Sequence, residues 1–310
     1  MNSVNYEYET AKNLIFWRNE FMVLWIIRIA LIAWTLVTCF LVVKDALTHK
    51  EDLNMKKAPL QLFIGFLVDF FDTWGIGCYA PNMALWKFTN TCEDDLVPGT
   101  LNIAHTVPVA LEGILFMTSV DIDPITLAAM IIASVVGAMV GSKIVTKWNL
   151  NVVRIALGIA LLAVAVVTVC RTAGVGPFGI AGEALALTGI KLVIGVVVNF
   201  FLGALMMIGF GLYSPCIALC ALLGMNIKAA FPIMMASCGF LMNAAVPNFI
   251  KENKYDRTNN LFVMIGGVVG VVAAYLLINY CFSLTTLSYV VCGVMVITSV
   301  RYFMDAKKAK

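Results

Sequence analysis

The sequence predicts an all-α polytopic membrane protein, and three observations predict it: an apolar composition, long apolar segments and an internal duplication. Of the 310 residues, 61% are hydrophobic and only 13% are charged, whereas soluble domains have about 45–50% and about 25%. Apolar stretches of roughly 18 residues or more, long enough to cross a bilayer as a helix, recur along most of the chain. A water-soluble fold is therefore disfavoured.

Four blocks of sequence recur in the same order in the two halves of the chain. They pair residues 64–71 with 194–201, 75–81 with 209–215, Asn102 and Pro108 with Asn226 and Pro232, and Gly137 and Gly141 with Gly266 and Gly270. The first match has an offset of 194 − 64 = 130 and aligns Asp69 with Asn199, and the second has an offset of 209 − 75 = 134. Ordered matches of this kind predict a duplicated membrane unit, the architecture of many secondary transporters.

Basic side chains predict how the chain is oriented in the membrane. They concentrate in four segments, residues 44–57, 143–147, 251–257 and 301–310. The positive-inside rule places these segments in the cytoplasm and the turn with Asp121 and Asp123 outside. This holds only if residues 60–88 and 190–223 each enter the membrane and return, as hairpins broken at a Gly-rich turn. The two halves then have opposite orientations in the cytoplasmic membrane. The amino terminus lies outside the cell, and the carboxyl terminus lies in the cytoplasm.

The predicted fold is thus an inverted repeat of a broken hairpin plus three transmembrane helices, preceded by one extra amino-terminal helix. The chain divides into an amino-terminal helix and loop (1–58), a first repeat (59–171), a linker (172–189), a second repeat (190–304) and a basic tail (305–310). The spans are expected at 21–43, then at 99–119, 124–145 and 152–171, and again at 228–249, 260–281 and 284–301. The two GxxxG spacings predict close helix packing.

The two Gly-Pro turns form the first candidate site. A broken helix leaves unpaired backbone N–H groups at the start of its second arm, and these give the helix amino terminus a partial positive charge that attracts small anions. Tyr79, Tyr213 and Ser214 would add hydroxyl donors. The substrate-binding residues predicted here are Gly75, Gly77, Tyr79, Pro81, Asn82, Gly209, Gly211, Tyr213, Ser214 and Cys216. The alternative is that the glycines and prolines only turn the chain and the tyrosines lie at the membrane interface.

A second candidate group lies at the start of the helix that follows each hairpin. His105 and Thr106 in the first half and Lys228 in the second are predicted to bind substrate as well. Ionisable side chains inside membrane segments are costly and tend to line a polar path, so Asp69, Asp72 and Glu112 are candidates for proton coupling. Glu112 lies seven residues after His105, which predicts a proton-linked pair on one helix face. An interhelical hydrogen bond would explain Asp69 equally well.

These motifs resemble the TauE/SafE family of sulfite and organosulfur anion exporters over roughly residues 60 to 300. The residues that carry the resemblance are Gly75, Gly77, Pro81, Ala104, Thr106, Gly137 and Gly141 in the first half and Gly209, Gly211, Pro215, Lys228, Ala230, Gly266 and Gly270 in the second. The resemblance implies transport of a small sulfur-containing anion, such as sulfite, thiosulfate or sulfoacetate, across the cytoplasmic membrane. Fewer glycines in the first turn, Pro232 and the extra amino-terminal span depart from the family pattern and leave the substrate open.

Other function classes find less support. The nine cysteines include no CxxC, which argues against a disulfide framework or a zinc site, and no metal or other cofactor is predicted. No polybasic arm suggests nucleic acid, so the expected partners are a small anion and the lipid bilayer, with the oligomeric state open. No catalytic residue is assigned. A transporter of a carboxylate or a metal is one alternative, and a membrane-embedded thiol-dependent enzyme, suggested by Cys216 and Cys220 four residues apart, is another.

Overall fold

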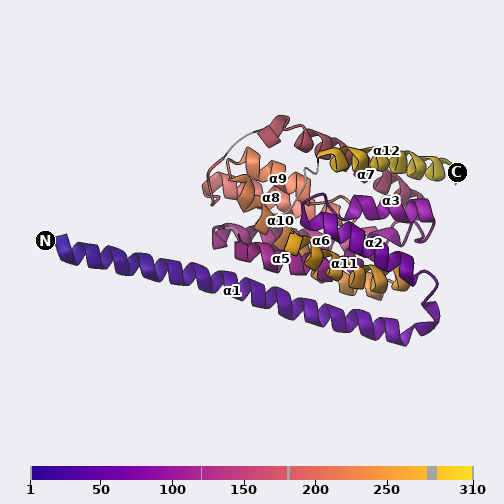
Figure 1. Ribbon diagram of the computed structural model, residues 1–310, viewed down its shortest axis with the longest axis horizontal. Coiled ribbons are helices and arrows are strands. Elements are labelled where there is room, and N and C mark those ends of the chain that lie inside the picture. The colour runs from indigo at the N-terminus through magenta and orange to yellow at the C-terminus, as the bar shows by residue number, and fades with distance from the viewer. Residues whose placement is uncertain (1, 120, 180–181, 278–284, 309–310) are drawn as a thin grey trace.

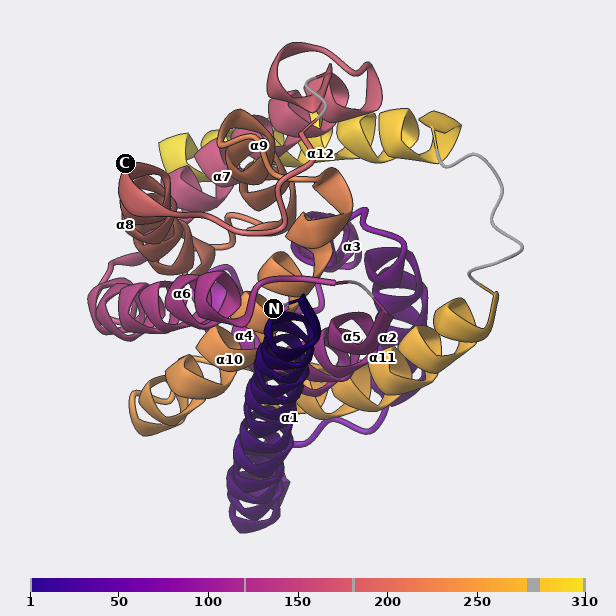
Figure 2. The same ribbon diagram turned by 90° about the vertical axis from the view of Figure 1, so that its left-hand side faces the viewer.

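The computed structural model describes residues 2–119, 121–179, 182–277 and 285–308, with most of their side chains from Met22 onward. Over that part of the chain the regular structure is helical, apart from an isolated bridge between Ala184 and Met225. The helices, shown in Figures 1 and 2, are α1 (Asn2–Thr48), α2 (Ala58–Thr73), α3 (Tyr79–Thr89), α4 (Val97–Ala104), α5 (Thr106–Ser119), α6 (Pro124–Val145), α7 (Leu150–Thr172), α8 (Gly189–Met206), α9 (Tyr213–Leu222), α10 (Ile227–Lys251), α11 (Arg257–Leu277) and α12 (Thr285–Lys308).

Several of these helices are long and apolar enough to cross a membrane. Within the described residues there are six: α1 from Met22, α6, α7, α8, α10 from Lys228, and α11. The pair α4 and α5, bent by 42°, makes a seventh candidate. The prediction of a polytopic all-α membrane protein is therefore confirmed. The predicted span boundaries at residues 281 and 284 lie outside the described residues, as do residues 180–181 of the predicted linker.

The predicted span 99–119 is not a single straight helix. It consists of α4 and α5, with His105 at the joint between them. Pro108 supplies the physical reason, because it has no amide hydrogen to bond the carbonyl of the residue four positions earlier, and its ring crowds that carbonyl. The expectation of one continuous helical face across this span is therefore wrong.

The two helix breaks occur at the two Gly-rich turns, where the sequence predicts them. One break separates α2 from α3 and the other separates α8 from α9. Gly75, Gly77 and Gly209 have φ angles of +85°, +94° and +91°, a region that glycine enters without steric cost and that other residues avoid. Gly211 is not in that region, so three of the four predicted turn glycines are required by the backbone itself.

Both GxxxG pairs are packing sites, as predicted. Gly137 and Gly141 on α6 lie against α8, while Gly266 and Gly270 on α11 lie against α2. A Cβ atom added at any of these four positions would lie between 1.9 and 2.5 Å from a backbone carbonyl oxygen of the facing helix. Contacts this close are open only to glycine, and they bring the helix axes together.

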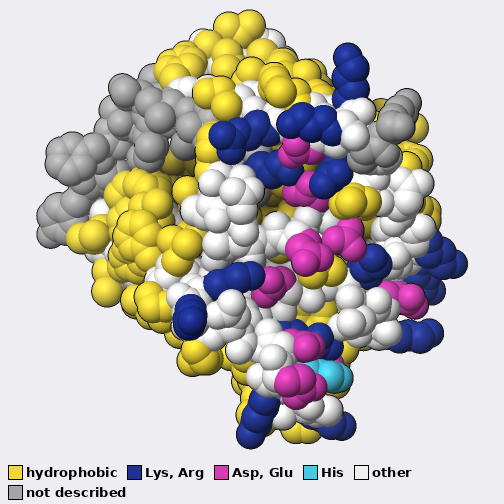
Figure 3. Space-filling view, turned by 90° about the vertical axis from the view of Figure 1, so that its right-hand side faces the viewer, with side chains coloured by type: hydrophobic (Ala, Val, Ile, Leu, Met, Phe, Trp, Pro, Cys, Tyr) yellow, Lys and Arg dark blue, Asp and Glu magenta, His cyan; other side chains and the backbone are white. Residues whose placement is uncertain are grey.

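The loops meet at two opposite ends of the molecule. At the end that we call the charged end, Lys57 donates to the carbonyl of Thr91 at 3.0 Å, and Lys87 forms ion pairs of 2.8 Å with Asp94 and Asp305. Figure 3 shows this face, where basic and acidic side chains lie together between apolar surfaces. Thus α2 begins, and α3 and α12 end, at the charged end.

At the other end, which we call the linker end, the chain segment after α7 binds two loops. One lies between α9 and α10, and the other lies just before α6. The amide of Asn226, just after α9, donates to the carbonyl of Ala184 at 2.8 Å. The amide of Asp123, just before α6, donates to the carbonyl of Leu185 at 3.1 Å. Asp123 also accepts from the amide of Thr126 at 2.8 Å and so caps the start of α6.

The extra amino-terminal helix, α1, lies along the outside of the other helices and extends beyond them at its amino-terminal end (Figure 1). Its Leu31 is buried in the core, and polar contacts add to this packing: Arg28 donates to the carbonyl of Met117, and Thr35 accepts from the side chain of Asn243 at 3.0 Å. Near its end, Asp45 accepts from Arg257 at 2.7 Å. The buried polar partners explain how an apolar segment tolerates Arg28.

Candidate functional site

A small cavity lies between the two helix breaks. Gly77 and Tyr79 line it from the first turn, and Gly211, Tyr213 and Ser214 line it from the second. The cavity volume is about 30 Å³, enough for one or two water molecules. The prediction that the two Gly-Pro turns face one another is therefore confirmed.

The amino termini of α3 and α9 both border this cavity. The side chains at the two N-cap positions, Cys78 and Leu212, make no capping hydrogen bond, so the first N–H groups of both helices have no N-cap partner. Pro81 and Pro215 lie in these first turns, where the N–H that a proline lacks would have no partner within the helix. Two partly positive helix ends thus converge on one small space.

The two tyrosine hydroxyls bind protein groups. Tyr79 donates to the side-chain oxygen of Asn102 at 2.9 Å, and Tyr213 donates to Glu112 at 2.7 Å. Each phenol has a single proton, so neither tyrosine has a donor left for a ligand in this arrangement, contrary to the sequence-based expectation. Ser214 differs, since its hydroxyl accepts from Arg171 at 3.5 Å and keeps its own proton.

Arg171 is a site residue that sequence reasoning missed. It lies in the last turn of α7, and its guanidinium donates both to the carbonyl of Gly75 and to the hydroxyl of Ser214. One cation therefore connects the two turns. Basic residues at the end of an apolar span usually reach the membrane interface, and the sequence contains no signal that this one turns inward.

Three carboxyl groups are fully buried around the cavity. Glu112 accepts from Thr73 and Tyr213, both at 2.7 Å, and so connects the end of α2 to the start of α9. Asp72 lines the cavity directly. Among the described residues, the Oδ2 atom of Asp69 has no hydrogen-bond partner, and the polar group beside Asp72 is Cys78.

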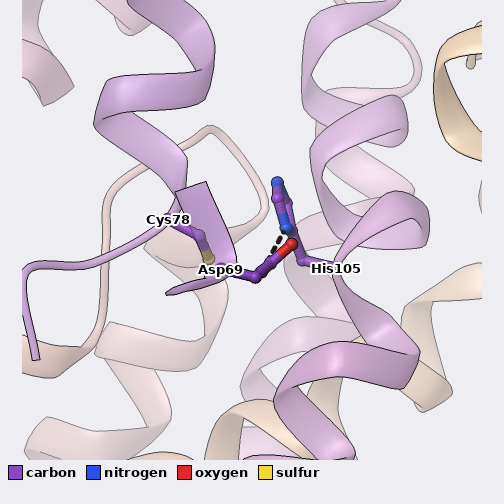
Figure 4. A group of neighbouring side chains, drawn as sticks. All are labelled: Asp69, Cys78 and His105. Carbon is purple, nitrogen blue, oxygen red and sulfur yellow. Dashed lines mark hydrogen bonds and ion pairs between the residues drawn. The ribbon is translucent and has the colours of Figure 1, made fainter. Parts of the chain in front are cut away.

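His105 pairs with Asp69, not with Glu112 as the seven-residue spacing predicted. Its Nδ1 lies 2.8 Å from the Oδ1 atom of Asp69, and its Nε2 lies 2.7 Å from the amide nitrogen of Asn82. Figure 4 shows Asp69 and His105 directed at one another, with the thiol of Cys78 beside them. The bend at His105 removes the common face with Glu112. The hydrogen bond offered as the alternative explanation of Asp69 is present, between α2 and the joint that His105 occupies.

The remaining predicted residues lie apart from the cavity lining. Thr106 is buried and donates to the carbonyl of Asn102 at 2.6 Å. Cys216 is buried in α9 next to Cys220, and Gly209 packs against Met83. Lys228 is exposed at the start of α10, so the expectation that it faces the substrate together with the turns is not met.

No protein-family model, no curated protein and no solved structure matches this chain. The resemblance to the TauE/SafE family therefore rests on the motifs alone and stays a prediction.

Proposed function

We propose that this chain is a secondary transporter of a small anion in the cytoplasmic membrane, with sulfur oxyanions and small sulfonates as the first substrate class. The observation that carries the proposal is the cavity between the two helix breaks. Two helix amino termini border it, and Arg171 donates to both turns. Partial positive charge at helix ends and a guanidinium are the groups that recognise oxyanions.

The arrangement of the ends supports an inverted repeat. The pair α2 and α3 begins and finishes at the charged end, because Lys57 before α2 binds the carbonyl of Thr91 after α3. The pair α8 and α9 begins and finishes at the linker end, because Asn226 after α9 binds Ala184 before α8. Each pair is a broken hairpin, and the two enter from opposite sides, as in many secondary transporters.

The helix packing supports the same symmetry with a different alignment. Gly65 on α2 lies against α11, and Gly203 on α8 lies against α6 in the corresponding way, with the nearest carbonyl oxygen 2.2 Å from an added Cβ in both cases. The offset is 203 − 65 = 138, in place of the 130 that sequence matching suggested. On this alignment Asp69 is not the counterpart of Asn199, and the two halves differ in their ionisable groups.

The buried carboxyl groups indicate that a proton moves together with the anion. Like charges about 4 Å apart repel by roughly 4 kcal/mol at the effective dielectric of a protein, so an anion would be opposed by an ionised Asp72 at the cavity wall. A proton on Asp72 removes this repulsion and adds a donor for the anion. We therefore assign proton coupling first to Asp72, with Glu112 and Asp69 as neighbouring proton acceptors.

The test is flux in proteoliposomes that contain the purified chain. Under an imposed pH gradient, at least one of sulfite, thiosulfate and sulfoacetate should cross, and Arg171→Gln should lower that flux by about 10-fold to 100-fold, the effect of losing a charge-assisted hydrogen bond of roughly 1.5–3 kcal/mol. Lys191→Gln, at an exposed position in the first turn of α8, is the matched control. Absence of flux for all three anions under every gradient would contradict the sulfur-anion assignment.

A further inference from the structure

Asp69, Cys78 and His105 form a compact cluster in the interior of the molecule. Their ligand atoms lie within 4.8 Å of one another, and all three side chains are buried. They come from three elements: α2, the turn before α3, and the joint between α4 and α5 (Figure 4). We propose that this cluster binds a divalent transition-metal ion of the Zn²⁺ class, which resides beside the cavity.

The donor atoms select this class of metal. A thiolate, an imidazole and a carboxylate are the protein ligands of Zn²⁺ and its neighbours, whereas Mg²⁺ and Ca²⁺ take oxygen ligands almost alone. Bonds of about 2.0–2.3 Å in a tetrahedral site put the ligand atoms roughly 3.3–3.8 Å apart. The present separations of up to 4.8 Å therefore need to close by about 1 Å. Cys78 follows Gly77, where an added Cβ would meet no atom within 4 Å, so the turn has space for such a shift.

The unpartnered atoms point to a missing positive charge. The Oδ2 atom of Asp69 has no hydrogen-bond partner in the described part of the chain, and Asp72 has only Cys78 beside it, although both residues are fully buried. Asp72 lies against Cys78 and places a second buried carboxyl group beside the ion. A buried ionised carboxyl is costly unless a cation or a hydrogen bond compensates it, and one divalent ion would serve both residues.

Asn82 lies where it can support His105 as a metal ligand. When a metal binds the Nδ1 atom of His105, the Nε2 atom carries the proton and needs an acceptor. The amide nitrogen of Asn82 now lies 2.7 Å from Nε2, and its Oδ1 atom has no partner among the described residues. Turning the amide over places Oδ1 against Nε2–H. Metal binding thus releases the proton of Cys78, moves the ring proton of His105 from Nδ1 to Nε2, and replaces the hydrogen bond between His105 and Asp69 with two metal bonds.

The inference does not rest on the proposed transport, because metal binding can be measured without any anion. The purified full chain in lipid nanodiscs is titrated with Co²⁺ and with Zn²⁺, and retained metal is counted after gel filtration. We expect one ion per chain, and for Co²⁺ a thiolate-to-cobalt charge-transfer band that Zn²⁺ displaces. A chain that binds metal yet moves no anion would refute the proposed function and leave this inference standing.

Variants separate the cluster from the other cysteines. Cys78→Ser should abolish the charge-transfer band, while Cys292→Ser, on α12 with its thiol against the carbonyl of Ala165, should leave the band and the stoichiometry unchanged. If Cys78→Ser does not fold, Asp69→Asn serves instead and should weaken Co²⁺ binding at least about 10-fold. Failure of the wild-type chain to retain metal, or an unchanged band in Cys78→Ser, or unchanged affinity in folded Asp69→Asn, would each overturn the proposal.

Discussion

At the scale of single residues, the site is governed by the balance of buried charge. Three carboxyl groups, those of Asp69, Asp72 and Glu112, are fully buried, and Asp72 lines the cavity that the two helix amino termini border, while Arg171 donates to both turns. Glu112 accepts two hydrogen bonds from side chains of other elements, whereas Asp72 lines the cavity with only Cys78 beside it among the described residues. Asp72 is therefore the group whose charge depends most on what enters the cavity.

The first prediction concerns Asp72→Asn, a side chain that is neutral at every pH. Wild-type flux should increase as the pH on the loading side falls, because protonation of Asp72 admits the anion. The variant should still exchange anion for anion but should lose accumulation driven by a pH gradient. Counterflow and gradient-driven uptake in proteoliposomes measure the two activities separately.

The control for this prediction is Asp95→Asn at the charged end, where Asp95 forms a part-exposed ion pair of 3.0 Å with Lys254. It removes a carboxylate without touching the cavity and should keep wild-type coupling. Uphill accumulation by Asp72→Asn equal to that of the wild type would assign the coupling proton to another group.

Sequence reasoning found most of the ionisable site residues but not their partners. Asp69, Asp72 and Glu112 stand out because charged side chains are rare in apolar segments. Their partners depend on how α2 and α5 lie against other helices, so spacing along the chain paired His105 with the wrong carboxyl group. Arg171 was missed for the same reason. No local spacing indicates the Asp69, Cys78 and His105 cluster either, since its members come from three separate elements.

At the scale of helices, local signals predicted the breaks well and the bend poorly. Glycine at positive φ and proline in a first helical turn act on the backbone where they stand, so both breaks were visible in the sequence. Pro108 also acts locally, but in the sequence it marks only the repeat, and α10 continues past its own Pro232 and Pro247. Whether a proline ends a helix depends on the hydrogen-bond partners of the neighbouring backbone groups. The spacing of residues along the sequence does not contain that information.

The second prediction concerns the packing of α11 on α2. In Gly266→Ala the new Cβ would lie 2.0 Å from the carbonyl oxygen of Leu62, so the helices must separate. Overpacking of this kind costs typically about 1–3 kcal/mol, against a gain of roughly 1 kcal/mol from replacing glycine inside a helix. The thermal unfolding temperature in nanodiscs should therefore fall. Gly293→Ala, with no atom within 4 Å of its added Cβ, is the matched control and should be neutral or stabilising.

At the scale of the whole molecule, three of the four basic segments predicted to share one side, residues 44–57, 251–257 and 301–310, have ion pairs at one end. Lys57, Lys87 and Lys254 each form an ion pair there, and α12 is attached to the same end through Asp305. The hydrogen bond from Lys87 lowers the pKa of the Asp305 carboxyl below its usual range, so this pair stays ionised at neutral pH and its contribution is lost only as pH falls through that lowered pKa. The charged end thus keeps this ion pair at neutral pH.

The last prediction places the two ends on opposite sides of the membrane. The positive-inside rule assigns the charged end to the cytoplasm, so the linker, which is bound to the loop before α6, should be outside. An epitope inserted after the exposed residue Val175 should react with antibody in intact cells, whereas an epitope at the carboxyl terminus should react only after permeabilisation. A cytoplasmic marker protein reports whether the cells are intact. Reaction of both epitopes from the same side would contradict the opposed orientation of the two halves, and with it the proposal that two oppositely oriented hairpins form one anion site.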